Sequence, residues 1–267
     1  MKNVVLGLSI AALATACATT TSPTGRTQRV GAVSQEQLNQ LGAQAFAQAK
    51  AKSPQSSNAG QTAYVRCVVD AIARQLPSGW QTQWETALFV DNSPNAFALP
   101  GGKVGINTGI FTVAKNQDQL AAVVAHEIGH VVSRHHDERV TRQMGAQAGL
   151  GILGAIIGSA YGQGAANATG QLGGLAAQGI FLLPTNRTQE TEADVVGQQL
   201  MASAGFNPQQ AVNLWENMIA ASSSRAPQWL STHPDPRSRI TELRGRAGAL
   251  GPAYQQARAS GRTPNCG

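Results

Sequence analysis

The strongest constraint on this chain is the stretch 120–132, an apolar run that contains the pattern His-Glu-x-x-His. His126 and His130 are four residues apart, so on an α-helix they share one face and can bind a single metal ion. Glu127 would lie about 100° further round the helix, within reach of a water molecule at that ion. Zinc peptidases place this pattern on a helix. Because the neighbouring residues are mainly Ala, Val and Ile, we expect a buried helix, in which imidazoles need a metal or hydrogen bonds.

Composition narrows the class of protein. With 267 residues and 42% hydrophobic content, the chain can form the core of one or two domains. Only five residues are His, so a chance match of the pattern on an ordinary core helix would be rare. A formal net charge of +6 and a pI near 9.7 would suit a nucleic-acid partner. The Lys and Arg residues are dispersed, however, so we expect a solvated basic surface and no nucleic acid.

The N-terminus has the features of a secretory signal. A short basic start, an apolar stretch and small residues precede Cys17, which predicts a signal peptide over 1–16. The small residues before Cys17 resemble the lipobox of bacterial lipoproteins, although Leu13 stands one place earlier than usual. This resemblance implies lipidation of Cys17; the alternative is simple cleavage. Ala18 resembles the residue type that follows the cysteine in outer-membrane lipoproteins, so we expect a lipid-anchored periplasmic protein.

The remaining cysteines are Cys67 and Cys266. An even number in an oxidising compartment allows a disulfide that ties the C-terminal tail to an early helix. The alternative is two unpaired thiols, and the sequence alone does not decide between them.

The elements expected along the chain form one domain over 34–250, preceded by a flexible tether over 17–33 and followed by a tail over 251–267. A capping box at Ser34 predicts the first helix, and three strands follow two helices. The expected helices are 35–53, 59–75, 117–136, 189–204, 208–221 and 236–249; the expected strands are 84–90, 96–99 and 103–107. We predict a mostly helical α+β fold with a small antiparallel sheet beside the metal helix. An edge strand there could bind an extended peptide, or the sheet could be purely structural.

Two further regions have an open interpretation. Residues 145–183 are rich in Gly and Ala, which suits a helical hairpin, a mobile lid over the site or low-complexity chain. His135 and His136 follow the metal motif, but His135 is five residues beyond His130 and would leave the ligand face of a continuous helix. We expect both to be surface residues or residues that support the ligands.

A catalytic zinc ion needs a third protein ligand. Acidic residues gather in the stretch 186–194, where Glu190 and Asp194 would share a helix face and Glu192 would point about 200° away from Glu190. One of the two could bind the metal and the other could orient a ligating imidazole. Helix geometry does not say which.

Four motifs occur together in the chain: His126-Glu127-x-x-His130, Arg187-x-x-Glu190-x-x-Ala193-Asp194, Asn95-Ala96-Phe97-Ala98-Leu99-Pro100-Gly101-Gly102 and Ser231-Thr232-His233-Pro234. In combination they resemble the zinc metallopeptidases that include HtpX and the CAAX prenyl proteases, in a soluble periplasmic lipoprotein branch. The resemblance covers about 34–243 and implies a gluzincin-like domain with one Zn²⁺ per chain. It also implies that Glu190 is the third ligand and that Asp194 orients one of the ligands. Asn186 stands where that family commonly has Ser.

His233 is open to two kinds of interpretation. Beside Pro234 it suits an ordinary loop or capping histidine. The resemblance implies a site role instead, either as a donor to the developing oxyanion or as a fourth ligand that closes the metal site. Arg237 and Arg239 could serve the same oxyanion or orient His233.

These features together predict a zinc endopeptidase in which Glu127 activates water at the metal. Its expected substrates are unfolded or misassembled envelope proteins, and its expected membrane contact is the lipid anchor. The alternative is a chaperone-like or assembly-quality-control binding module with a latent zinc site. The sequence does not indicate an oligomeric state.

Overall fold

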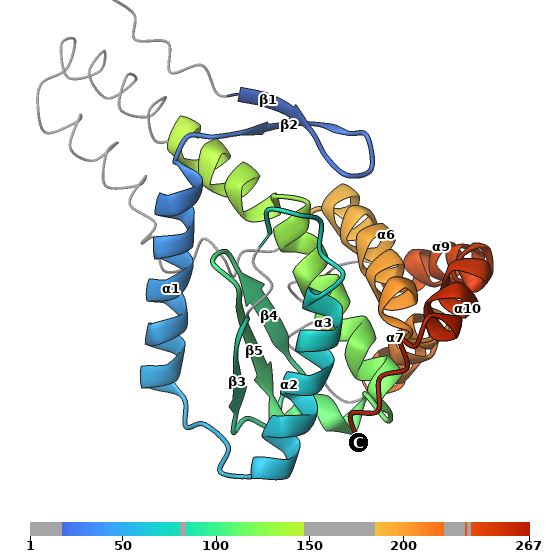
Figure 1. Cartoon of the computed structure of the whole chain (residues 1–267). Helices are drawn as coiled ribbons and strands as arrows, with labels where there is room; N and C mark the ends of the chain where they lie inside the picture. The colour runs from blue at the N-terminus through green and yellow to red at the C-terminus, as the bar shows by residue number, and fades with distance from the viewer. Residues whose placement is uncertain (1–17, 81–83, 147–184, 222–232, 234–235) are drawn as a thin grey trace, which may run out of the picture.

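A buried helix, α3 (Gln117–Val132), lies at the centre of the protein. The computed structural model describes residues 18–80, 84–146, 185–221, 233 and 236–267. Every residue of α3 from Gln119 to Val132 is buried. Figure 1 shows a small sheet and α6 (Arg187–Ala204) on opposite sides of α3, and α2 (Ala59–Ala73) also contacts it. The helix expected around the metal motif and its burial are both confirmed.

The sheet beside α3 is mixed, not antiparallel. Its strands are β3 (Glu85–Phe89), β4 (Ala96–Leu99) and β5 (Lys103–Asn107), in the order β3-β5-β4. β4 and β5 are antiparallel, but β3 and β5 run parallel, so the expectation was wrong for that pair. After β3 the chain first crosses to the far edge, and a turn with positive φ at Gly101 and Gly102 then brings β5 back into the middle. β4 is therefore an edge strand next to α3.

Helix α1 (Gln35–Lys52) packs on the turn that joins β4 to β5. The predicted capping box is present, because Ser34 and Gln37 each cap the other's backbone N–H. At Gly42 a Cβ atom would lie 2.2 Å from the carbonyl oxygen of Pro100, so only glycine permits this approach. Phe46 on the same helix contacts the rings of Phe89 and Phe97 edge-on.

The N-terminal segment is ordered as a β-hairpin, so the expected flexible tether is wrong for residues 18–30. β1 (Ala18–Thr21) and β2 (Thr27–Val30) pair antiparallel. The hairpin lies across the end of the molecule where α6 begins (Figure 1), and the backbone N–H of Gly31 donates to Asp137 at 2.9 Å. The signal peptide and the predicted lipidation site, Cys17, lie outside the described residues.

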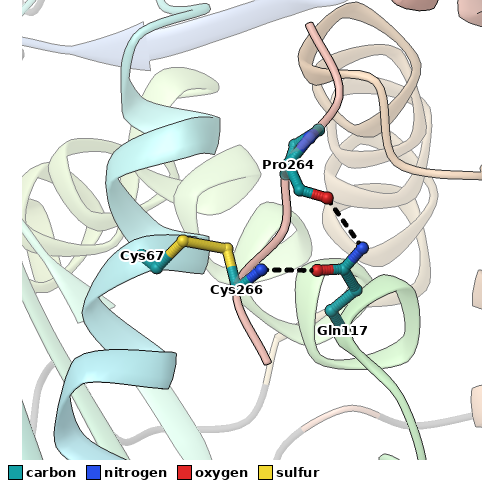
Figure 2. Close-up of a disulfide and its surroundings, with 4 residues drawn as sticks. All are labelled: Cys67, Gln117, Pro264 and Cys266. Atoms are coloured by element: carbon teal, nitrogen blue, oxygen red, sulfur yellow. Dashed lines mark hydrogen bonds between the residues drawn. A yellow bond between two sulfur atoms is a disulfide. The ribbon is translucent and has the colours of Figure 1, made fainter.

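The C-terminal segment is also part of the domain. α7 (Gln210–Ala221) contacts α3, α9 (Pro236–Ala249) packs on α6 and α7, and α10 (Gly251–Ala259) packs on α6. Beyond α10, Cys266 forms a disulfide with Cys67 of α2, with Cα atoms 5.5 Å apart (Figure 2). The side chain of Gln117 bonds the backbone of Pro264 and Cys266 at 2.9 Å each. The tail thus joins α2 to the N-terminus of α3.

In the described part of the chain, no helix has both the length and the apolar character needed to cross a membrane. Most of the Gly/Ala-rich segment, from residue 147 onward, lies outside the described residues.

Candidate metal centre

Four side chains from three parts of the chain meet beside α3. They are His126 and His130 from α3, Glu190 from α6 and His233, which precedes α9. All are buried, and one ligand atom from each lies within 4.8 Å of the others. The structure therefore brings together the two histidines of the motif, the acidic residue sixty positions later and the late histidine. Their common meeting point is a candidate metal site.

The close approach of α3 and α6 creates this cluster. A Cβ atom at Gly129 would lie 2.7 Å from the carbonyl oxygen of Ala193, and one at Gly197 would lie 3.0 Å from the nitrogen of His126. Two glycines thus allow the helix backbones to meet, which is why the carboxylate of Glu190 reaches both imidazoles. Its oxygens lie 3.4 Å from His126 Nε2 and 3.3 Å from His130 Nε2.

His126 is oriented by a carboxylate in the core. Its Nδ1 lies 3.0 Å from Asp194 Oδ1, which leaves Nε2 facing the cluster. The guanidinium of Arg239, only 1% exposed, donates to Asp194 at 2.7 and 2.6 Å and to Glu190 at 2.5 Å. It also stacks 4.1 Å from the ring of Trp215. Arg239 therefore holds the two carboxylates, whereas Arg237 is exposed.

His130 is oriented differently, through a second imidazole. Its Nδ1 lies 2.8 Å from Nδ1 of His135, and Nε2 of His135 lies 3.1 Å from Glu192 Oε2. α3 ends at Val132 rather than near 136, because Arg134 adopts a positive φ of 55° and the chain becomes helical again from 135. This break returns His135, which is fully buried, to His130. A supporting role is one of the two expected for His135 from the sequence, but this contact was not predicted because a continuous helix was assumed.

His233 lies between Glu190 and Glu127. Its Nδ1 is 3.1 Å from both oxygens of Glu190 and 3.2 Å from His126 Nε2. Its Nε2 is 3.4 Å from Glu127 Oε1, and both side chains are almost fully buried. His233 is therefore part of the site and not an ordinary loop residue.

Comparisons with known proteins agree with this geometry. The sequence profile described as Peptidase family M48 matches residues 59–247, which is more than half of the chain. The chain belongs to this family. The mitochondrial metalloendopeptidase OMA1 of Schizosaccharomyces pombe is 38% identical over 163 residues, which are 60% of this chain and 46% of that protein. The beta-barrel assembly-enhancing protease of Escherichia coli is 34% identical over 180 residues, 66% of this chain and 37% of that protein. The chain thus spans less than half the length of these relatives.

The donor set of this M48 domain fits a divalent metal, and zinc in particular. Burial alone would raise the pKa of Glu190, but the surrounding imidazoles, His233 foremost, hold it well below its usual range. Burial lowers the pKa of His130 well below its usual value, so its ring is neutral at neutral pH. Burial opposes charge on His126, yet Asp194 and Glu190 raise its pKa to about 9. A neutral imidazole and an ionised carboxylate are metal donors, and a bound cation would displace the proton of His126.

Proposed function

We propose that the protein is a zinc-dependent endopeptidase. The observation that carries the proposal is the buried meeting of His126, His130 and Glu190 beside Glu127, in a domain of peptidase family M48. Three protein ligands with one remaining position are the arrangement of catalytic zinc sites. The relatives described above are named as proteases, which supports the same reaction.

The mechanism assigns Glu127 the proton transfers. When bound, zinc supplies Lewis acidity that polarises the scissile carbonyl and acidifies water. Glu127 accepts the proton of the attacking water and delivers it to the nitrogen of the leaving amine. His126, His130 and Glu190 would hold the ion, and Asp194 fixes the ring of His126. Once a substrate is bound, Nε2 of His233, 3.4 Å from Glu127, is placed to donate to the oxyanion.

The edge strand β4 offers a place for an extended substrate. The hydrogen bond from Asn107 N to Asn95 O shows that these two residues form a hydrogen-bonded pair at the end of the ladder between β4 and β5. Because such pairs alternate along an antiparallel ladder, the backbone N–H and C=O groups of Ala96 and Ala98 point away from β5. His136 Nε2 lies 2.9 Å from the carbonyl oxygen of Ala98, and a bound strand would compete for that oxygen. Main-chain pairing of this kind selects unfolded chains over folded ones.

The physiological substrates under this proposal are unfolded or misassembled envelope proteins. The signal sequence and Cys17 support a lipid-anchored location in the bacterial periplasm, at the outer membrane. The disulfide between Cys67 and Cys266 suits that oxidising compartment. The name of the Escherichia coli relative, a beta-barrel assembly-enhancing protease, supports a role in the same setting.

Replacing Glu127 by Gln tests the proposal. The variant should bind one zinc ion per chain, as the wild type does, but lose about 10²- to 10⁴-fold in cleavage of an unfolded substrate such as reduced casein. Metal content and peptide release are measured on the same preparations. Full activity of the Glu127→Gln chain would contradict the mechanism.

A second candidate function, a binding module for envelope proteins with a latent zinc site, is favoured by the position of His233. Its Nδ1 lies 3.1 Å from both oxygens of Glu190, close enough for the two residues to bind the same metal ion. If His233 closes the site, His233→Ala should cleave unfolded casein faster than the wild type. If His233 donates to the oxyanion, the same variant should be slower. A chain that binds casein but does not cleave it in either form would favour the binding module.

A further inference from the structure

We propose that the N-terminal β-hairpin is part of the metal site, because His135, Glu192 and Arg26 position His130 through an uninterrupted chain of hydrogen bonds. The inference rests on the proposed zinc site and adds three positioning residues to it. None of the three lies in the zinc-binding pattern, and Arg26 lies outside the region that matches the family.

The first step of the chain joins two imidazoles. Nε2 of His130 faces the cluster, 3.1 Å from His126 Nε2 and 3.3 Å from Glu190. If Nε2 binds the metal, Nδ1 must carry the proton and donate it. The atom that it meets at 2.8 Å is Nδ1 of His135, which must then be the acceptor. His135 therefore has to be neutral and protonated on Nε2.

The second step fixes that tautomer of His135. Its Nε2 lies 3.1 Å from Oε2 of Glu192, and a carboxylate oxygen accepts but does not donate. Glu192 is 3% exposed, and it lies on the side of α6 that points away from Glu190. The acidic residue that appeared unrelated to the metal thus selects the tautomer of His135, which in turn selects that of His130.

The third step attaches the chain to the hairpin. Arg26 Nε donates to Glu192 Oε2 at 2.7 Å, and the hydroxyls of Ser22 and Thr24 donate to Oε1 of the same carboxylate. The other end of the guanidinium forms a bidentate pair with Glu138 at 2.9 and 2.9 Å. Three residues of one hairpin thus satisfy a buried carboxylate that would otherwise be costly to hold in place. Without the hairpin, Glu192 would lose these donors and His135 would lose its fixed partner.

A matched pair of variants at His135 tests the first two steps. His135→Leu removes the acceptor, whereas His135→Asn keeps an acceptor oxygen near the position of Nδ1. Zinc affinity of the full chain is measured by competition with a chromophoric chelator. His135→Leu should bind zinc about 10- to 100-fold more weakly than the wild type, and His135→Asn should recover most of the loss. Imidazole ¹⁵N spectra of the zinc-loaded wild type should show His135 protonated on Nε2.

A second pair tests the hairpin. Arg29 lies on β2, three residues after Arg26 in the same hairpin, but it is exposed. Arg26→Ala should weaken zinc binding several-fold, by less than His135→Leu, and Arg29→Ala should leave it unchanged. Thermal unfolding of the metal-free chains is recorded in parallel, because a purely structural role would lower the melting temperature without a selective loss of zinc.

Three results would overturn the inference. These are wild-type zinc affinity in His135→Leu, no recovery in His135→Asn, and equal affinities for Arg26→Ala and Arg29→Ala. Failure of the proposed function looks different, because the wild-type chain itself would then bind no zinc or would not cleave casein.

Discussion

The two histidines of the metal motif sit one helical turn apart but are supported from opposite directions. His126 is held by Asp194 and Arg239, which come from two helices of the core and are 3% and 1% exposed. His130 is held by His135 and Glu192, whose last partner is Arg26 on a peripheral hairpin, with a side chain 26% exposed. One ligand depends on the interior of the domain and the other on its N-terminal edge.

This difference predicts unequal tolerance to substitution. A buried ion pair that loses one partner leaves an uncompensated charge, whereas in a partly exposed pair water can replace the lost partner. The His126 side should therefore be rigid and costly to change. The His130 side should be adjustable, because its outer partner can separate from the domain without unfolding the core.

The largest expected effect is at Arg239. Replacing it by Met leaves Asp194 and Glu190 without their shared guanidinium and should cost about 3–5 kcal/mol in the free energy of unfolding of the metal-free chain. The equivalent change Arg26→Met should cost less, about 1–2 kcal/mol, because Ser22, Thr24 and His135 still contact Glu192 and water can reach the outer end of the pair. Urea unfolding with chelator present measures both. Similar costs for the two variants would break the comparison.

Removing the disulfide tests whether the support of His126 is independent of the hairpin that supports His130. The bond joins residues 199 positions apart and ties the tail to α2, while α10 packs on α6, which carries Asp194. Replacing Cys67 and Cys266 by Ala should cost about 2–5 kcal/mol. Hydrogen exchange should become faster in α10 and stay unchanged in the hairpin. Equal loss of protection in both would show that the two supports are not independent.

The local part of the site could be predicted from the sequence, because helix periodicity fixes how residues four apart relate. The facing pair His126 and His130, the burial of α3 and the helix start at Asn116 all follow from short-range rules. Geometry also placed Glu190 and Asp194 on one face. It could not separate ligand from supporting residue, because that depends on how far α6 lies from α3, which Gly129 and Gly197 set.

The rest depends on long-range pairing or on a single backbone angle. One residue, Arg134, with φ of 55°, moves His135 from the opposite face back to His130. The partners of Arg26, Glu138 and Glu192, lie more than 100 positions away, and no periodicity connects them. The parallel pairing of β3 with β5 is likewise a matter of chain path. The acidic residue that geometry directed away from the metal, Glu192, was the one sequence signal that a second buried polar network exists.

The smallest expected effect concerns the outer end of that network, the pair between Arg26 and Glu138. Burial alone would raise the pKa of Glu138, but the bidentate contact with Arg26, and a bond from Gln189, hold it below its ordinary value. A depressed folded-state pKa stabilises the fold above the unfolded pKa of about 4.3, and the contribution disappears as the pH falls through the folded-state value. At pH 7, Glu138→Gln should therefore lower the free energy of unfolding by up to about 1 kcal/mol relative to the wild type.

That difference should shrink as the solution is acidified below pH 4, because protonation gives the wild-type carboxyl the same neutral character as the amide. Unfolding in urea at pH 7, 4 and 3 measures it, with Arg29→Ala as a control for the general effect of removing a charge from this edge. A difference that stays constant with pH would mean that the hairpin is held by shape and hydrogen bonds, not by charge. The His130 side would then resemble the His126 side more closely than the exposure of Arg26 implies.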